Sequence, residues 1–408
     1  MFWKTSDGST GRLVQLCAGY FFFYVATGLI VKFFTGSVNG HPARLKEISF
    51  LVYNTFGANL TCLLPAVILG WWHLKSIRPI RVGRWEIPSE LLYIIPSGVC
   101  TAVVIPTTTL MYTLPISVMV AMVIMRASVI VIGRLVDAVQ IRQGILDKRV
   151  FWEENAAVVF AVVAACIEIF MSDGKQGSKP SFIHNTAAVV ILVSYLVAYA
   201  IRIYIMNYYK NTRPKAGQVG PPDRASAASA SPLAPAGSGG EAAVPGPSIR
   251  IQASAPVDNN RAFFATEQIA ASVTMMFMVV ALLLSPRFFP SWMELGQVSE
   301  FVSAVSHPMS GWGWAALSGV AFGVVAFFSV FIFMFKGRTA TFTGLVNRLT
   351  SLVAGTTATL LGWAFFGSKL PSLQNWISLG FVLVAVAFLT RAEKKRTQEL
   401  LLENSSRS

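Results

Sequence analysis

The sequence predicts an all-α polytopic membrane protein with ten transmembrane helices, arranged as two inverted five-helix repeats, and with the N and C termini cytoplasmic. Of its 408 residues, 54% are hydrophobic and 13% are charged, whereas about a quarter of the residues in soluble domains are charged. Apolar runs of about 20 residues, enough to cross a hydrocarbon core as a helix, recur along the chain. Lys and Arg gather in alternate loops between these runs.

Charges, prolines and glycines bound ten such runs and set the ends of the expected helices. The first run begins near Arg12, is longer than a signal-peptide core and lacks a small-residue cleavage site, so we expect it to be retained as a span. The cysteines all fall inside the runs, where they are expected to pack as small apolar side chains. The predicted spans are residues 12–35, 48–72, 88–112, 115–137, 153–171, 184–209, 263–285, 311–336, 339–363 and 371–390.

The basic residues predict the orientation of these spans. With a cytoplasmic N-terminus, the cytoplasmic segments hold 23 Lys and Arg residues and the opposite face holds 6. This asymmetry follows the positive-inside rule. It also accounts for the net charge of +14, which would otherwise suggest nucleic acid as a partner. We therefore expect the lipid bilayer, and no nucleic acid, as a partner. The other four basic residues lie within spans: Lys32, Arg126, Arg202 and Arg348.

Residues 210–262 divide the chain, because they are small, polar and rich in Pro, Gly, Ala and Ser. Such a composition predicts a disordered cytoplasmic linker. The first half, 1–209, holds repeat one (12–171) and the sixth helix (184–209), while 263–390 completes repeat two and 391–408 forms a basic cytoplasmic tail. An odd number of spans in each repeat makes the second repeat enter the membrane in the opposite direction, as an inverted repeat requires.

The two repeats share a local pattern in their fourth spans. Arg126 is followed two positions later by Ser128, and Arg348 is followed at the same spacing by Thr350; each pattern ends with a glycine seven positions after the Arg. A rise of about 1.5 Å per residue places both arginines about 15 Å inside their helices. The pattern therefore predicts two guanidinium groups at the bilayer midplane.

An Arg at the centre of a span costs about 2.5–3.5 kcal/mol and is expected to face a partner or a cavity. Glu168 and Glu267 lie within about one turn of their span ends, and Asp137 marks an end, so the sequence places no carboxylate at midplane. A substrate anion would supply the missing charge, because the guanidinium fork binds phosphate or carboxylate through two parallel hydrogen bonds. The alternative is that each Arg binds backbone carbonyls or a more distant carboxylate.

These considerations give a set of candidate substrate-binding residues from both repeats. Lys32 and Arg202 lie late in the first span of each half, where they are close enough to an end to extend to the interface. Both are expected to extend to the interface, and Lys32 is also kept as a candidate. The candidates are Arg126, Arg348, Asn347, Ser128, Thr350 and Lys32.

No residue pattern indicates catalysis or metal binding. The four histidines lie in loops or at span ends, without Cys or carboxylate at ligand spacing. No span carries a cluster of His, Asp or Glu suited to acid–base chemistry. We therefore expect no enzyme activity, no metal and no cofactor.

Two passages resemble the drug/metabolite transporter superfamily. Residues 112–126, YTLPISVMVAMVIMR, resemble its turn from the third to the fourth helix, and residues 363–389, WAFFGSKLPSLQNWISLGFVLVAVAFL, resemble its transition from the ninth to the tenth. The nucleotide-sugar and triose-phosphate translocator branch is the nearest, and it places a basic residue that engages substrate phosphate about ten positions into the fourth and ninth helices. Arg126 and Arg348 match those places. The chain lacks the Gly-Ala-Leu-Asn-Lys signature and the adjacent Lys-Arg pair of some branch members, so the resemblance implies anion transport without specifying a nucleotide.

The leading hypothesis is a secondary transporter, an exchanger or facilitator, that moves a small organic anion by alternating access, with nucleotide sugars and phosphorylated metabolites as candidate substrates. One alternative is an exporter of amino acids or amphiphilic metabolites, in which the arginines are structural. Another is a non-transporting membrane scaffold, whose function would be lost on deletion of the linker. A Golgi or ER membrane and a bacterial plasma membrane fit equally, and a homodimer is compatible with the sequence.

Overall fold

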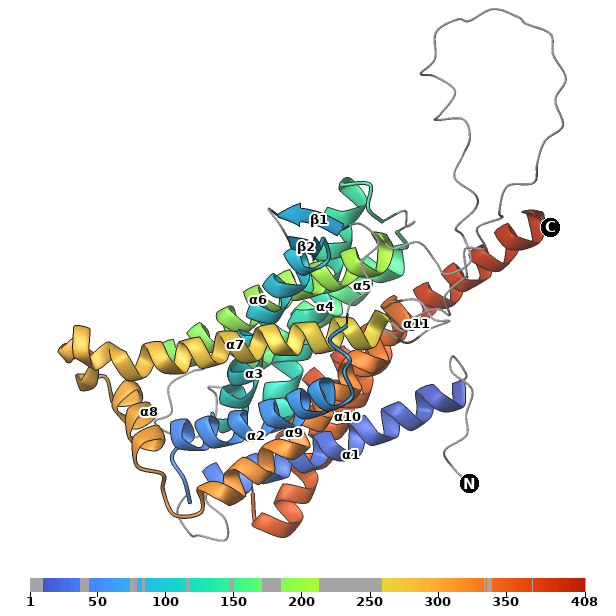
Figure 1. The fold of residues 1–408 in the computed structure, drawn as a ribbon. Coiled ribbons are helices and arrows are strands. Elements are labelled where there is room, and N and C mark those ends of the chain that lie inside the picture. Colours follow the sequence, from blue (N-terminus) through green and yellow to red (C-terminus); the bar gives the residue numbers. More distant parts are fainter. Residues whose placement is uncertain are drawn as a thin grey trace, which may run out of the picture.

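The computed structural model consists almost entirely of α-helices, as the sequence predicts (Figure 1). Nine of the helices in the described part of the chain are long and apolar enough to cross a membrane. The protein is therefore an integral multi-pass membrane protein. The residues described are 10–36, 44–73, 79–82, 85–114, 118–146, 150–170, 185–212, 259–333, 335, 340–368 and 370–407.

The helices lie close to the predicted spans, because each apolar run gives one continuous helix. The nine candidate spans begin and end within a few residues of the predicted ones at most boundaries. The long helices are α1 (Thr10–Thr35), α2 (Glu47–Ile68), α3 (Leu91–Thr113), α4 (Val118–Arg142), α5 (Trp152–Phe170), α6 (Thr186–Thr212), α7 (Asn259–Phe288), α9 (Trp312–Phe333), α10 (Ala340–Phe366) and α11 (Leu373–Arg407).

Helix α5 occupies the predicted fifth span but does not belong to the nine. It carries Glu153 and Glu154 in its first turn and Glu168 near its end, more charges than the apolar stretches of the nine candidate spans hold. Glu153 accepts a hydrogen bond from Lys395, and Glu154 accepts one from Arg396, both on α11. The first turn of α5 is therefore neutralised by the basic end of the last helix.

Several segments predicted as loops, linker or tail have regular structure. The hairpin β1 (Pro79–Val82) and β2 (Trp85–Pro88) precedes α3, and the short helices η3 (Pro290–Glu294) and α8 (Gly296–Ser306) follow α7. The predicted linker overlaps α6 and α7 at its two ends, and its residues 213–258 lie outside the described residues. The predicted tail from 391 continues α11 as one helix, because its Glu, Lys and Leu residues favour a helix.

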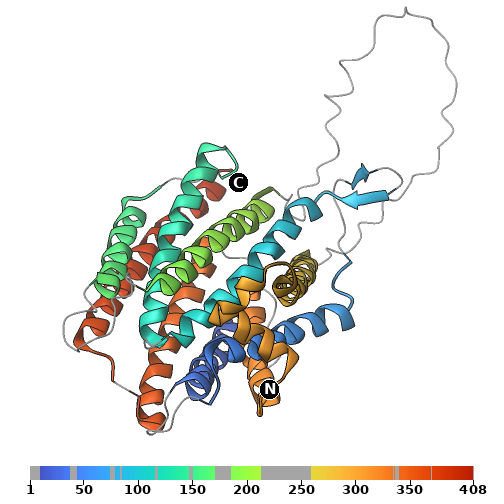
Figure 2. The ribbon, with the colours of Figure 1, turned by 90° about the vertical axis from the view of Figure 1, so that its left-hand side faces the viewer.

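The helices pack as one bundle in which sequence neighbours are often not spatial neighbours. The closest pairs are α2 with α9, α5 with α11, α3 with α6 and α7, and α1 with α9 and α10. Helices α5 and α11 lie at one edge of the bundle, and α2 and α7 lie toward the other (Figure 2). The start of α1 and the end of α11 lie at the same end, opposite to α8 (Figure 1).

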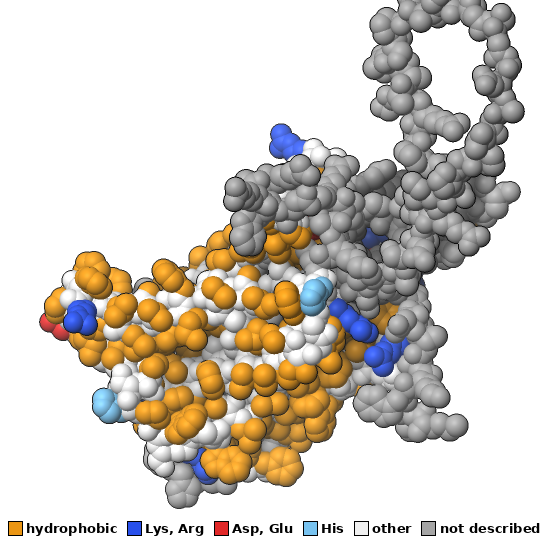
Figure 3. Space-filling model, viewed as in Figure 1, with side chains coloured by type: hydrophobic (Ala, Val, Ile, Leu, Met, Phe, Trp, Pro, Cys, Tyr) orange, Lys and Arg blue, Asp and Glu red, His pale blue; other side chains and the backbone are white. Residues whose placement is uncertain are grey.

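The outer surface of the bundle is apolar, as a lipid-facing surface requires. Hydrophobic side chains cover most of the face shown in Figure 3, and the charged side chains visible there lie toward its ends. On α7, the side chains of Val273, Met276 and Phe277 are 65%, 64% and 74% exposed. In a soluble protein such a surface would cause aggregation, whereas here it faces hydrocarbon.

Helices α2 and α9 approach each other through glycines. A Cβ added to Gly57 would lie 1.8 Å from the carbonyl oxygen of Ala316, and one added to Gly319 would lie 2.1 Å from that of Asn54. Small residues permit such backbone contact, which drives helix association in membranes through van der Waals packing. Asn54 also donates a hydrogen bond to Ser318 across the interface, at 2.9 Å.

We expect Gly57→Ala to destabilise the protein by at least about 1–3 kcal/mol, because the new methyl group must push two helix backbones apart. The control is Gly380→Ala on α11, where an added Cβ meets nothing within 4 Å. Alanine there should be neutral or should stabilise the helix by about 0.5–1 kcal/mol. Unfolding of the purified protein, followed by circular dichroism, measures both changes. Equal stability of the two variants would contradict the expected close contact.

Candidate functional site

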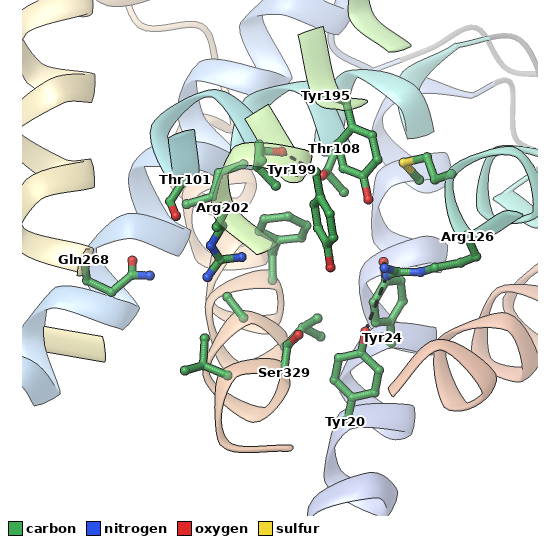
Figure 4. A pocket seen from close by; sticks show the side chains of 17 residues that line it. Tyr20, Tyr24, Thr101, Thr108, Arg126, Tyr195, Tyr199, Arg202, Gln268 and Ser329 are labelled. Atoms are coloured by element: carbon green, nitrogen blue, oxygen red, sulfur yellow. Dashed lines mark hydrogen bonds between the residues drawn. The ribbon is translucent and has the colours of Figure 1, made fainter. Parts of the chain in front are cut away.

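A cavity lies inside the bundle, among six of its helices (Figure 4). Its walls come from α1, α3 and α4 and from α6, α7 and α9. Its volume is about 80 Å³, enough for roughly six water molecules at 10–15 Å³ each. The lining residues that carry polar groups are Tyr20, Tyr24, Thr101, Thr108, Arg126, Tyr195, Tyr199, Arg202, Gln268 and Ser329.

Arg126 on α4 is one of the two cations in the wall of this cavity. It lies in the middle of the apolar sequence of α4 and is 8% exposed. Its guanidinium donates to the hydroxyl of Tyr24 at 2.9 Å and to that of Tyr20 at 3.5 Å, while its Nε atom is buried without a hydrogen-bond partner. Among the described residues no carboxylate forms an ion pair with it. A buried positive charge therefore faces the cavity with only neutral partners.

Four tyrosines surround this charge, in two pairs one helical turn apart. Tyr20 and Tyr24 come from α1, with their ring centroids 5.2 Å apart, and Tyr195 and Tyr199 come from α6 at the same separation. Residues four apart lie on one face of a helix, so each pair presents two rings together. The ring of Tyr24 lies 5.8 Å from the Arg126 guanidinium carbon, within reach of a cation–π interaction.

A second cation in the cavity wall, Arg202 on α6, is paired. It donates from Nε and Nη2 to the two oxygens of Glu267 on α7, at 2.8 and 2.9 Å. Ser97 and Thr101 on α3 donate to the same carboxylate at 2.6 and 3.1 Å. The side chains of Arg202 and Glu267 are 15% and 0% exposed. The expectation that Arg202 extends to the interface is wrong, because Glu267 gives it a partner inside the bundle.

Gln268 lies beside this ion pair in sequence and on the cavity wall. It is 1% exposed, and its Oε1 atom is buried without a hydrogen-bond partner. Figure 4 shows its amide directed into the cavity, on the side opposite to Arg126. This residue, the ion pair and the tyrosines were not predicted from the sequence. The Tyr pairs had a signal in the sequence: the same spacing occurs in the first span of each half.

Of the six residues predicted for the site, Arg126 is the one that lines the cavity. Arg348 lies on α10 against α4, where a Cβ added to Gly133 would meet its Nη2 atom at 2.9 Å; its own Nε is buried without a partner. Asn347 donates to Ser329 at 2.9 Å and so supports the cavity wall from behind. Arg348 and Asn347 therefore lie behind the cavity rather than on it.

The side chains of the other three predicted residues donate hydrogen bonds to backbone carbonyls. Ser128 donates to Ile124 and Thr350 donates to Val346, both on their own helices at 2.8 Å. The ammonium of Lys32 donates to the carbonyl of Leu114 at the end of α3, at 2.9 Å. In this conformation their polar groups serve helix structure and helix contacts.

Within the described residues, no group of three or more His, Cys, Asp or Glu side chains is placed to hold a metal ion. Comparison with protein-family models, with curated proteins and with solved structures gives no match. The kind of ligand that the cavity can bind is therefore inferred from the geometry of its own residues.

Proposed function

We propose that the protein is a secondary transporter that moves a small organic anion across the membrane, with the cavity as its binding site. The observation that carries the proposal is Arg126: a buried guanidinium on the cavity wall with no carboxylate partner among the described residues. Burying an uncompensated charge in a membrane protein is costly and is typical of substrate and ion pathways. An anionic solute would supply the counter-charge.

The charges around the cavity favour an anion over a cation. Glu267 neutralises Arg202 through two hydrogen bonds, so this pair adds no net charge. Tyrosine hydroxyls are neutral at physiological pH and hold the Arg126 guanidinium in place. The described groups thus leave one positive charge, contributed by Arg126. Phosphate and carboxylate groups are the natural partners of such a guanidinium.

The packing of the helices supports two inverted repeats. If α1 to α5 correspond to α6, α7, α9, α10 and α11, then the most extensive contacts have counterparts. The pair α2 with α9 corresponds to α7 with α3, the pair α3 with α6 corresponds to α9 with α1, and the pair α1 with α10 corresponds to α6 with α4. Arg126 and Arg348 occupy corresponding helices. Such repeats are a common architecture of secondary transporters, whose sites lie at the repeat interface.

The ends of the helices support the proposed orientation. The start of α5 and the basic part of α11 meet through hydrogen bonds of Glu153 with Lys395 and of Glu154 with Arg396. The start of α5 and the C-terminal part of α11 therefore lie at the same end of the bundle, as the positive-inside pattern requires. We propose that this end is cytoplasmic.

Transport requires the cavity to enlarge and to open. Drug-sized ligands occupy pockets of about 300–1,000 Å³, several times the cavity volume of about 80 Å³. Because α1, α3 and α4 of one proposed repeat and α6, α7 and α9 of the other form the wall, rocking of one repeat against the other would change the size of the cavity and access to it. The carboxylate of Glu267 is held by Arg202, Ser97 and Thr101, so we propose exchange or facilitated transport rather than proton symport.

A thermal-shift screen of the purified chain tests the proposal, because a ligand that binds the folded state raises its apparent stability. The probes are nucleotide sugars, sugar phosphates, carboxylates, neutral amino acids and amphiphilic amines. We expect organic anions to raise the Tm and amines to leave it unchanged. At a concentration about 100 times the Kd the gain is about 2.7 kcal/mol. Stabilisation by amphiphilic amines alone would favour the alternative of an amphiphile exporter.

A further inference from the structure

Gln268 is a buried polar group that the anion site does not explain. Figure 4 places it on the side of the cavity opposite to Arg126, with Arg202 and Thr101 beside it. It comes from α7 and is 1% exposed. Its backbone carbonyl accepts a hydrogen bond from Ser272, which is ordinary for a helix, but its side-chain Oε1 has no partner.

The other polar groups on this side of the cavity are already engaged. Thr101 donates to the carbonyl of Ser97 and to Glu267, Thr108 donates to the carbonyl of Val104, and Ser329 accepts from Asn347. Arg202 is held by Glu267. Buried amides normally have hydrogen-bond partners, and each exception calls for an explanation. A ligand group in the cavity would give the Gln268 amide a partner.

The chemistry of the amide defines the group that it would bind. An amide carries no charge, accepts through its oxygen and donates through its nitrogen, so it suits a neutral hydroxyl or amide. The rest of the cavity wall is largely apolar and aromatic, with Tyr199, Phe322 and Val325 among its residues. The cavity therefore has an anion-binding side and a neutral hydrogen-bonding side, and the rest of its wall suits carbon skeletons.

We propose that Gln268 is a specificity-determining residue that binds a neutral hydroxyl or amide group at the end of the solute remote from its anionic group. The substrate class is then an organic anion with a polar, hydrogen-bonding far end, rather than an anion with an alkyl tail. This inference rests on the proposed function, because it takes Arg126 as the site of the anionic group. A site built to bind a hydroxyl discriminates strongly against an analogue that lacks it, since its own polar group is then left unpaired.

The test uses matched probes that differ in their hydroxyl groups. The pairs are glycerol 3-phosphate with propyl phosphate, glucose 6-phosphate with hexyl phosphate, and gluconate with hexanoate. Apparent affinities for the full chain come from the concentration dependence of the Tm. We expect the hydroxylated member of a pair to bind about fivefold more tightly, and Gln268→Leu to abolish this preference while the alkyl member keeps its affinity.

Two further variants separate binding from folding. Asn59→Leu is the matched control, because the Asn59 amide oxygen accepts a hydrogen bond from Ser272 and does not line the cavity. The preference of this variant for hydroxylated probes should equal that of the wild type. Gln268→Asn keeps an amide and should retain part of the preference, so a folding defect of the Leu variant does not block the test. Circular dichroism and the Tm without ligand confirm the fold of each variant.

The outcomes distinguish this inference from the proposed function. Equal affinity for both members of every pair, lost together in Arg126→Ala, would overturn the role of Gln268 and leave the anion site standing. A preference that is unchanged in Gln268→Leu and Gln268→Asn would also overturn it. If no anion in any pair stabilises the protein, or if Arg126→Ala keeps all stabilisation, then the proposed function fails and the inference fails with it.

Discussion

Arg126→Ala is expected to reduce anion uptake into proteoliposomes by at least about hundredfold. The loss follows from the charge-assisted hydrogen bonds that a guanidinium forms with phosphate or carboxylate, which are roughly twice as strong as neutral ones, and from the low dielectric of the buried site. Arg126→Lys keeps the charge but loses the planar fork. It should therefore retain a small fraction of the activity. Uptake of a radiolabelled anion identified in the thermal-shift screen is the measurement.

The control for this variant is Ser128→Ala on the same helix. Its hydroxyl donates to the carbonyl of Ile124 and does not line the cavity, so its loss should change uptake less than about threefold, as expected for a weak local hydrogen bond. Normal expression and an unchanged Tm for Arg126→Ala would show that the fold is intact. Undiminished uptake in a folded Arg126→Ala protein would refute the anion site at this residue.

Arg348→Ala tests whether the two arginines are equivalent. The sequence pattern predicts that both bind the anion, so that either substitution abolishes uptake. In this conformation Arg348 lies against Gly133 and not on the cavity wall, so direct binding by Arg126 alone predicts a smaller effect for Arg348→Ala. An equally large loss with an unchanged Tm would mean that Arg348 reaches the solute in another conformation of the transport cycle.

The positions of the helices were predictable because a membrane span is a local property of sequence. The predicted span 115–137 corresponds to α4, Val118–Arg142, and 88–112 corresponds to α3, Leu91–Thr113. Each needs only an apolar run of sufficient length. The length of the last helix was less predictable. The charge of residues 391–408 indicated a cytoplasmic tail, whereas their helix propensity allows α11 to continue to Arg407.

Much of the cavity was not predictable, because it depends on contacts between distant segments. Arg126 stood out by its depth in an apolar span, which is a local feature. Glu267 was assigned to the end of a span, and nothing in the sequence indicates that it meets Arg202 across 65 positions. Gln268 has no local signal at all, since a single Gln in an apolar helix fits either a helix contact or a binding site. Tertiary packing decides between them.

Removing one partner of the buried pair Arg202 and Glu267 should cost more stability than breaking any of the more exposed ion pairs. We expect Glu267→Gln to destabilise the protein by about 3–5 kcal/mol, because it leaves the Arg202 charge buried without a counter-charge. Arg202→Leu should cost less, since Ser97 and Thr101 still donate to the carboxylate. Unfolding in SDS or guanidinium, followed by circular dichroism, gives the free energies.

The double variant Arg202→Leu/Glu267→Leu separates the two contributions to this cost. If the penalty arises from an unpaired charge, then removing both charges should recover most of the stability, as replacement of buried ion pairs by apolar residues does elsewhere. The strong coupling between the two sites would appear as non-additivity in the double-mutant cycle. The control is Arg391→Leu, because Arg391 is 67% exposed and lies 3.8 Å from Glu153; exposed pairs contribute about 0–1 kcal/mol. A Glu267→Gln protein as stable as the Arg391→Leu protein would mean that the pair does not hold α6 to α7.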